Sequence, residues 1–348
     1  MKVGIDLIRA RLRAPFVSAE GALEVRELLL LRLEDDAGRV AFGEAAPLES
    51  YDGVAIEECR AALEDCRELL AESDGSNRSE LLEQCERAAV LPQAVAAVDL
   101  ALWDLAGQRA GQPVWRLLGA DAASPVEVNY TIAAEDRAGA AREAARARSA
   151  RFRCVKVKVA IGDDSGRVAA VRAAAGPGVT IRLDANGAWT VPEASAALRA
   201  LEPTGIELCE EAVKGVRETR ELSTLTTVPL AIDETAGEPG ALEERVCDAA
   251  CLKIARCGGI TGLMDAARRA RAAGYGVYLA STLDGPLGIA AALHAAAVLA
   301  PERPSGLATL QLFHGRGDPL TPRAGVIRPP GGHGLGSGLA GWYRTQTR

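Results

Sequence analysis

The sequence predicts an α/β protein, a (β/α)8-type barrel of the modified TIM kind with an N-terminal α+β capping domain. Two observations lead to this fold class. From about residue 125, short apolar runs alternate with amphipathic helical stretches through eight repeats, the pattern of a barrel of parallel strands. Before that point, strand-like and helical stretches form separate blocks. A doubly wound open sheet is the competing architecture, but the Gly-rich phosphate fingerprint expected after its first strand is not visible.

The capping domain is expected to span residues 1–122. Strand-like residues at 3–12 and 24–33 are followed by a turn at 35–38 and a shorter strand at 40–44, which predicts a hairpin. Helical stretches follow at 54–70, 78–88 and 92–110. The last of these begins with proline, carries apolar residues at helical spacing and is followed by glycine, so both of its ends are marked in the sequence.

The barrel is expected to span residues 123–315. Its eight predicted strands lie at 126–131, 154–159, 179–184, 206–210, 229–233, 250–254, 276–280 and 306–310. Helices are predicted between them, for example at 134–149, 191–201, 261–273 and 286–299. The Gly/Pro-rich tail, residues 316–348, is expected to pack on the capping domain.

Composition narrows the class of protein. The chain has 348 residues, 48% of them hydrophobic, and a net charge of −7, which argues against nucleic acid or an anionic membrane as a partner. Its eight cysteines form no CxxC pair and it has only three histidines, so a zinc cluster is not expected. Neither a signal peptide nor an apolar run of membrane length is visible. We expect a cytoplasmic protein that acts on a small-molecule carboxylate, and we leave a homo-oligomer open.

Lysine is rare in this chain, because only five of its 40 basic residues are Lys. A buried Lys can lose its proton whereas Arg stays charged, so scarce lysines are candidates for chemistry. Three of the five fall, together with carboxylates, at the carboxyl ends of successive predicted strands, in the order Lys156 and Lys158, Asp184, Glu210, Asp233, Lys253. In a (β/α)8 barrel these ends converge on one mouth, where active sites lie.

The order of these residues predicts a metal site flanked by two bases. Asp184, Glu210 and Asp233 form a hard oxygen site that suits Mg²⁺, with Mn²⁺ as an alternative. A metal that binds a substrate carboxylate makes the adjacent C–H acidic, and Lys158 and Lys253 stand on either side to exchange that proton. The implied step is proton abstraction α to a carboxylate, through an enediolate.

These motifs resemble the enolase superfamily, and within it the muconate-lactonizing-enzyme subgroup of the mandelate racemase/muconate lactonizing enzymes. The matching segments are 155–159 (VKVKV), 183–189 (LDANGAW), 209–213 (CEEAV), 230–235 (LAIDET) and 252–262 (LKIARCGGITG). The resemblance implies the metal ligands and lysine bases given above, with Lys156 as a supporting charge and Asn186 and Glu234 as groups that orient ligands. One departure is Ala212, where the family commonly has proline.

The choice of reaction depends on segment 280–288 (ASTLDGPLG), which resembles that of the o-succinylbenzoate synthases. By that resemblance Ser281 and Thr282 are substrate-binding candidates, because hydroxyls and helix N-terminal N–H groups suit a carboxylate. Asp284 is a further candidate by resemblance to the dipeptide epimerases, which typically carry Asp-x-Asp here to hold a substrate ammonium group; this chain keeps the second Asp and has Thr282 in place of the first. By analogy with the family, substrate discrimination is expected to come from two capping segments, the loop near 15–21 and segment 47–53, in which Tyr51 is expected to cover the substrate. The favoured activity is therefore a synthase-like dehydration, a lyase step of menaquinone biosynthesis.

Several alternatives stay open. Within the subgroup they are isomerases: a dipeptide epimerase, an N-succinylamino acid racemase or a muconate cycloisomerase. Outside it they are a Schiff-base aldolase with Lys253 as the nucleophile, and a barrel that binds a ligand without catalysis.

Overall fold

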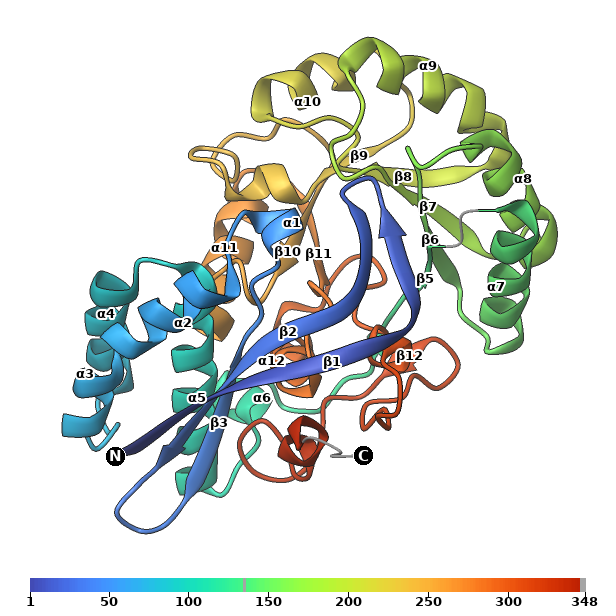
Figure 1. Cartoon of the computed structure of the whole chain (residues 1–348). Coiled ribbons are helices and arrows are strands. Elements are labelled where there is room, and N and C mark those ends of the chain that lie inside the picture. The colour runs from blue at the N-terminus through green and yellow to red at the C-terminus, as the bar shows by residue number, and fades with distance from the viewer. Residues whose placement is uncertain (134–135, 345–348) are drawn as a thin grey trace.

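The computed structural model describes residues 1–133 and 136–344 (Figure 1). Its N-terminal part is a three-stranded antiparallel sheet with the strand order β1-β2-β3, formed by β1 (Lys2–Ser18), β2 (Gly21–Glu34) and β3 (Val40–Ala45). The helices that follow β3 are α1 (Glu49–Asp52), α2 (Ile56–Asp65), α3 (Arg67–Glu72), α4 (Arg78–Ala89), α5 (Pro92–Ala110) and α6 (Val114–Leu117).

The apolar run of β2 is buried on both of its faces. Leu29, Leu31 and Leu33 belong to a core shared with α2, α4 and α5, whereas Leu28 and Leu30 belong to the large core that continues into the barrel. Successive strand residues point to opposite faces, so a continuous run of leucines marks a strand covered on both sides. The capping sheet is therefore a layer between its own helices and the barrel.

The barrel contains a seven-stranded sheet in the order β11-β10-β9-β8-β7-β6-β5, in which every recorded pairing is parallel. Its strands are β5 (Tyr130–Ile132), β6 (Cys154–Lys158), β7 (Thr180–Asp184), β8 (Ile206–Glu210), β9 (Leu230–Ile232), β10 (Ala249–Lys253) and β11 (Gly276–Ala280). The surrounding helices are α7 (Arg137–Ser149), α8 (Asp164–Ala175), α9 (Val191–Leu201), α10 (Val216–Ser223), α11 (Gly259–Ala272) and α12 (Pro286–Leu299). Residues 134 and 135, where the helix before β6 was expected to begin, lie outside the described residues.

The fold class is confirmed, but the predicted eighth strand at 306–310 is wrong. Only isolated bridges occur there, Ser305 with Val128 and Gly306 with Ala280, and a short 3₁₀ helix (Leu310–Leu312) follows. The N–H of Gly306 donates to the carbonyl oxygen of Leu279 over 2.7 Å, so this segment still joins the last strand of the sheet. The ring is closed by an irregular segment, and the barrel is a modified one.

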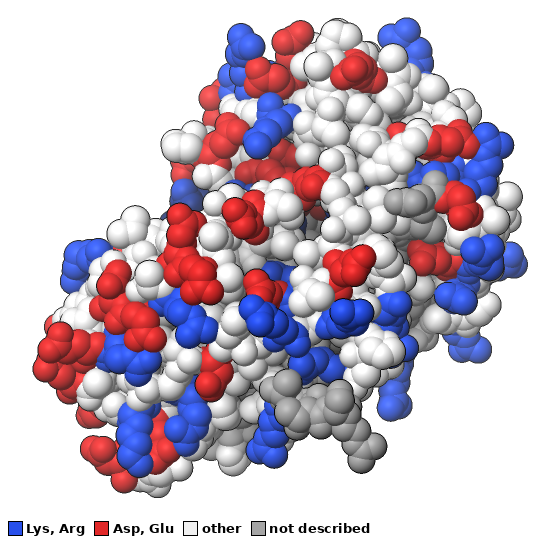
Figure 2. Space-filling model, viewed as in Figure 1, with Lys and Arg blue, Asp and Glu red and all other residues white. Residues whose placement is uncertain are grey.

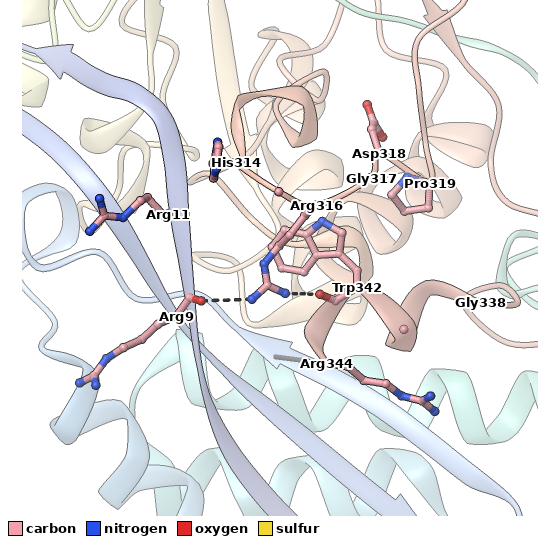
Figure 3. A pocket seen from close by; sticks show the side chains of 12 residues that line it. Arg9, Arg11, His314, Arg316, Gly317, Asp318, Pro319, Gly338, Trp342 and Arg344 are labelled. Carbon is pink, nitrogen blue, oxygen red and sulfur yellow. Dashed lines mark hydrogen bonds between the residues drawn. The ribbon is translucent and has the colours of Figure 1, made fainter. Parts of the chain in front are cut away.

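The C-terminal segment returns to the capping sheet. Arg316 donates to the carbonyl oxygens of Trp342 and Arg9, and its guanidinium carbon lies 4.6 Å from the centroid of the Trp342 ring (Figure 3). The N–H of His314 donates to the carbonyl oxygen of Arg11 over 2.8 Å. A cleft of about 890 Å³ lies here, and the side chains of Arg9 and Arg11 on its wall point away from Arg316 (Figure 3).

Acidic and basic side chains are interspersed on the face shown in Figure 2, as expected for a chain with 47 acidic and 40 basic residues. Within the described part of the chain, no helix is both long enough and apolar enough to cross a membrane.

Candidate active site

Strand alternation places Lys156 and Lys158 inside the barrel. The valines that alternate with them, Val155 and Val157 on β6 and Val159 just after it, belong to the core between the sheet and the helices, so the two lysines share the opposite, inward face. Beneath them the barrel interior is filled by a small apolar cluster that includes Cys251 and Tyr278. The lysines therefore lie at the upper, carboxyl end of a packed barrel.

Asp184 and Glu210 are the next strand-end residues in register. Lys158 pairs with Asp184, and Asp184 with Glu210, across the parallel ladder. The Nζ of Lys158 lies 2.8 Å from Oδ2 of Asp184, and the Nζ of Lys156 lies 2.9 Å from the same oxygen and 3.0 Å from Oε1 of Glu210. Burial acts to raise the pKa of Asp184, but Lys156 and Lys158 outweigh it and hold that pKa below its ordinary value.

Asp233 and Lys253 form the second half of the site together with Tyr51 of the capping domain. The Nζ of Lys253 lies 2.6 Å from Oδ2 of Asp233, and the Tyr51 hydroxyl donates to Oδ1 of Asp233 over 2.9 Å. The Nζ of Lys253 also lies 3.8 Å from the centroid of the Tyr51 ring, within cation–π range. Burial acts to lower the pKa of Lys253, but the adjacent Asp233 carboxylate more than compensates and raises it.

Asn186 and Glu234 connect the two halves. The Nζ of Lys158 donates to Oδ1 of Asn186 over 2.7 Å, and Nδ2 of Asn186 donates to Oε1 of Glu234 over 2.9 Å. Asn186 has φ of 46°, a left-handed conformation that Asn tolerates better than most residues. Glu211, next to Glu210, instead accepts from the N–H groups of Asp233 (2.6 Å) and Thr235 (2.9 Å). Glu211 thus holds the loop that carries Asp233.

The donor set is suited to a hard divalent cation. Among the described residues, ligand atoms of Glu210, Asp233 and Cys251 lie within 4.8 Å of one another, and Asp184 shares Lys156 with Glu210. Burial raises the pKa of the Cys251 thiol well above its ordinary value, so it stays protonated and is a poor ligand. Carboxylate oxygens without a thiolate favour Mg²⁺ or Mn²⁺ over soft metals, and the three buried carboxylates fit such an ion.

A cavity of about 220 Å³ lies between the barrel mouth and the capping domain. The predicted residues that line it are Tyr51, Lys156, Lys158, Asn186, Lys253, Ser281 and Thr282. Ser281 Oγ lies 3.0 Å from Thr309 Oγ1, and both residues line the cavity. The carboxylates of Asp184, Glu210 and Asp233 are buried beneath the lysines.

Asp284 is not brought into this cavity. It is completely buried, and its Oδ1 accepts from the Thr282 hydroxyl over 2.6 Å, whereas its Oδ2 has no hydrogen-bond partner among the described residues. The N-terminus of α12 is also occupied: the N–H of Gly285 donates to Oε1 of Glu44 over 2.9 Å, and that of Leu287 donates to the Tyr343 hydroxyl over 2.9 Å. Substrate binding by Ser281, Thr282 and Asp284 stays a prediction: Ser281 and Thr282 line the cavity, whereas Asp284 lies outside its described lining.

Two residues of the site, Tyr278 and Arg256, escaped the sequence analysis, and a third, Glu20, lies in the predicted capping loop at 15–21. The Tyr278 hydroxyl donates to Oε2 of Glu210 over 2.7 Å, Arg256 donates to the Tyr51 hydroxyl over 3.3 Å, and Glu20 lines the cavity. Strand alternation could have found Tyr278, which shares the inward face of β11 with Ala280. Within the predicted loop no local signal singles out Glu20, because the tip of the β1–β2 hairpin meets the barrel only in the folded chain (Figure 1).

The fold and site together define a barrel enzyme with buried carboxylates and lysines at its strand ends and a capping domain over its mouth. The chain belongs to the enolase superfamily, in its mandelate racemase/muconate lactonizing enzyme subgroup. Residues 139–341 match the family model "Enolase C-terminal domain-like", and residues 3–119 match the "Mandelate racemase / muconate lactonizing enzyme, N-terminal domain".

Individual relatives differ in activity. The chain is 27% identical over 348 residues to a D-Ala-D/L-Ala epimerase of Cytophaga hutchinsonii, covering 94% of this chain and 92% of the relative. It is 37% identical over 214 residues to an o-succinylbenzoate synthase of Thermobifida fusca, covering 58% of this chain and 66% of the relative. A substrate-liganded structure of L-Ala-D/L-Glu epimerase from Bacillus subtilis matches with a TM-score of 0.88 and 27% identity, over 97% of this chain and 98% of that one.

Proposed function

We propose that this enzyme is a racemase or epimerase that moves the proton on the carbon next to a substrate carboxylate. The observation that carries the proposal is that Lys158 on β6 and Lys253 on β10 line one cavity. Strands β7, β8 and β9, which lead into the three carboxylates, lie between β6 and β10 in the sheet. Two acid–base groups on opposite sides of one carbon are what inversion of configuration requires.

Each residue has a role in this proposal. A divalent cation such as Mg²⁺, held by Asp184, Glu210 and Asp233, would bind the substrate carboxylate and make the neighbouring C–H acidic. Lys158 takes the proton from one face and Lys253 returns a proton on the other. Asn186 and Tyr51 orient these two lysines, through the 2.7 Å hydrogen bond to Lys158 and the ring contact with Lys253, respectively.

An o-succinylbenzoate synthase is the second candidate, favoured by the higher identity of the matched part of the chain to such a synthase. The geometry gives it less support. A second substrate carboxylate would need donors near α12, and the N–H groups of Gly285 and Leu287 are already bound to Glu44 and Tyr343. The hydroxyls of Ser281 and Thr309 are the donors that remain beside this part of the cavity.

The test is incubation of the Mg²⁺-loaded enzyme in D₂O with dipeptides and N-acyl amino acids. The proposal expects deuterium at the α-carbon together with inversion, measured by NMR and chiral chromatography. Formation of o-succinylbenzoate from the synthase substrate, with no exchange in any dipeptide or N-acyl amino acid, would sink the isomerase proposal and establish the second candidate.

Single-lysine variants test the two-base arrangement. Lys158→Ala and Lys253→Ala should each slow inversion by about 10²–10⁴-fold, the usual contribution of a general base. Each variant should still exchange the α-proton of one stereoisomer, because the remaining lysine serves one face. Lys214→Ala is the matched control, since Lys214 is exposed and absent from the cavity lining. Loss of exchange with both stereoisomers in both variants would contradict the assignment of one lysine to each face.

A further inference from the structure

We infer that Glu20 recognises a protonated nitrogen of the substrate, so that this enzyme selects substrates carrying an ammonium or guanidinium group. The inference rests on the proposed function and names a substrate class for it. Glu20 stands at the tip of the β1–β2 hairpin and supplies the single acidic side chain in the described lining of the active-site cavity.

The Glu20 carboxylate lacks a partner within the described residues. Its backbone N–H donates to Oγ of Ser18 over 3.2 Å, but no hydrogen bond or ion pair reaches its side chain. The nearby cations are committed elsewhere, because Lys158 lies 2.8 Å from Asp184 and Lys253 lies 2.6 Å from Asp233. A half-buried carboxylate without a partner is unfavourable, and a substrate cation would supply the missing partner.

The electrostatics of the cavity agree with this reading. Burial raises the pKa of Glu20 to about 7, against the opposing pull of Lys158 and Lys253. A cation placed against Glu20 would favour its ionised form, and the substrate carboxylate at the other end of the cavity would face the lysines. The cavity thus has a negative group on the capping side and positive groups at the barrel mouth, which matches a substrate with the opposite arrangement of charges.

The same charge disfavours a second carboxylate in this place. A substrate with a negative group directed toward the hairpin would be repelled by ionised Glu20, and the described lining offers no arginine to pair with it. Glu20 should therefore favour cationic over dianionic substrates, although it is not one of the proposed acid–base groups.

The experiment compares pairs of dipeptides that differ in one protonated nitrogen. L-Lys-L-Ala is compared with Nε-acetyl-L-Lys-L-Ala, and L-Ala-L-Ala with N-acetyl-L-Ala-L-Ala, so that a side-chain cation and a terminal ammonium are tested separately. The readout is the ratio of kcat/KM for α-deuterium exchange within each pair. We expect about a tenfold or larger preference for the protonated member of at least one pair, the effect of a charge-assisted hydrogen bond.

Variants tie the preference to Glu20. Glu20→Gln should bring the ratio close to one, and Glu20→Lys should reverse it in favour of the acetylated member. Glu24→Gln is the matched control and should keep the wild-type ratio, because Glu24 is an exposed carboxylate on β2 that is absent from the cavity lining. A purely structural role of Glu20 would lower kcat/KM for both members equally and leave the ratio unchanged.

Equilibrium binding separates failure of this inference from failure of the proposed function. Titration calorimetry with the same dipeptides and Mg²⁺ measures the charge preference whether or not the dipeptides are turned over. A binding preference that disappears in Glu20→Gln, without any exchange, would refute the isomerase proposal and keep the charge selectivity. Equal binding of both members of both pairs to the wild-type enzyme would overturn the inference.

Discussion

His294 gives this enzyme a pH-dependent stability whose size can be worked out. It lies fully buried on α12, where Nδ1 accepts from the backbone N–H of Trp115 over 3.3 Å and Nε2 donates to the carbonyl oxygen of Leu335 over 3.1 Å. Both contacts suit the neutral ring. Burial lowers the pKa of His294 from 6.5 to about 4, so the unfolded chain takes up this proton more readily than the folded one.

The sign and the magnitude follow from proton linkage. The stabilisation is fully present above the unfolded pKa of 6.5 and is lost as the pH falls from there toward the folded pKa of about 4. With 1.36 kcal/mol per pKa unit, acidification from about pH 7.5 to about pH 5 should remove about 2 kcal/mol through this one group. Other buried groups also titrate in this range: burial raises the pKa of Asp99 and of Asp104 to about 6.

The variant His294→Gln isolates the contribution of the histidine. Gln can keep a donor toward Leu335 but does not titrate, and we expect it to cost about 1 kcal/mol near pH 7.5. The free energy of unfolding is measured for both proteins by urea titration at constant salt near pH 7.5 and pH 5. Groups common to the two proteins cancel, so the wild type should lose about 2 kcal/mol more than the variant. Parallel losses in the two proteins would refute the reasoning.

Three further predictions concern packing, the capping domain and the metal. Gly43→Ala should lower the free energy of unfolding by about 3 kcal/mol or more, because the added Cβ would lie 1.9 Å from the carbonyl oxygen of Ala97. Gly178→Ala is the control: its Cβ would enter open space, so it should change that free energy by less than about 0.5 kcal/mol. Equal urea midpoints for the two variants would contradict this prediction. Arg26→Met removes the donors to the carbonyl oxygens of Ala46, Pro47 and Thr282, so the free energy of unfolding should fall by about 2–5 kcal/mol. The segment that carries Tyr51 should also loosen and raise KM, and a KM equal to that of the wild type would contradict this second effect. Chelation should abolish α-proton exchange in D₂O and added Mg²⁺ should restore it, whereas activity that persists in chelator would exclude the metal site.

Helix ends were predictable where the sequence marks them, and the last strand was not. The predicted bounds 92–110 and 286–299 coincide with α5 and α12, both of which have proline in the first turn. The segment at 306–310 has the apolar composition of a strand, yet it forms only single bridges. Whether this segment pairs as a strand depends on where Val128 and Ala280, which are distant in the sequence, place their backbone groups. The local pattern of apolar residues does not contain that information.

The positions of the lysines and carboxylates could be predicted from the predicted strands. Alternation on a strand fixes which face a side chain occupies, and strand ends meet at one mouth, so the lysines and carboxylates could be placed before any contact was known. Glu20 and Arg256 reach the site through loops, and the Tyr51 hydroxyl that Arg256 contacts lies far away in the chain. Asp284 lies outside the described cavity lining, and the hydrogen bond that the Thr282 hydroxyl donates to it is a contact that the sequence did not indicate.

The barrel interior uses its two kinds of basic residue at different depths. Arg182, paired in register with Lys156, is fully buried and donates to both oxygens of Glu207, over 2.9 and 3.2 Å, and to the carbonyl oxygen of Pro304 over 2.6 Å. A planar guanidinium that stays charged suits this permanent structural contact. Lys158 instead meets Asp184 at the cavity through one ammonium group. In the proposed function Lys158 is a base, so replacing it by Arg would preserve the positive charge and remove the base, and the two kinds of basic residue are not interchangeable at this position.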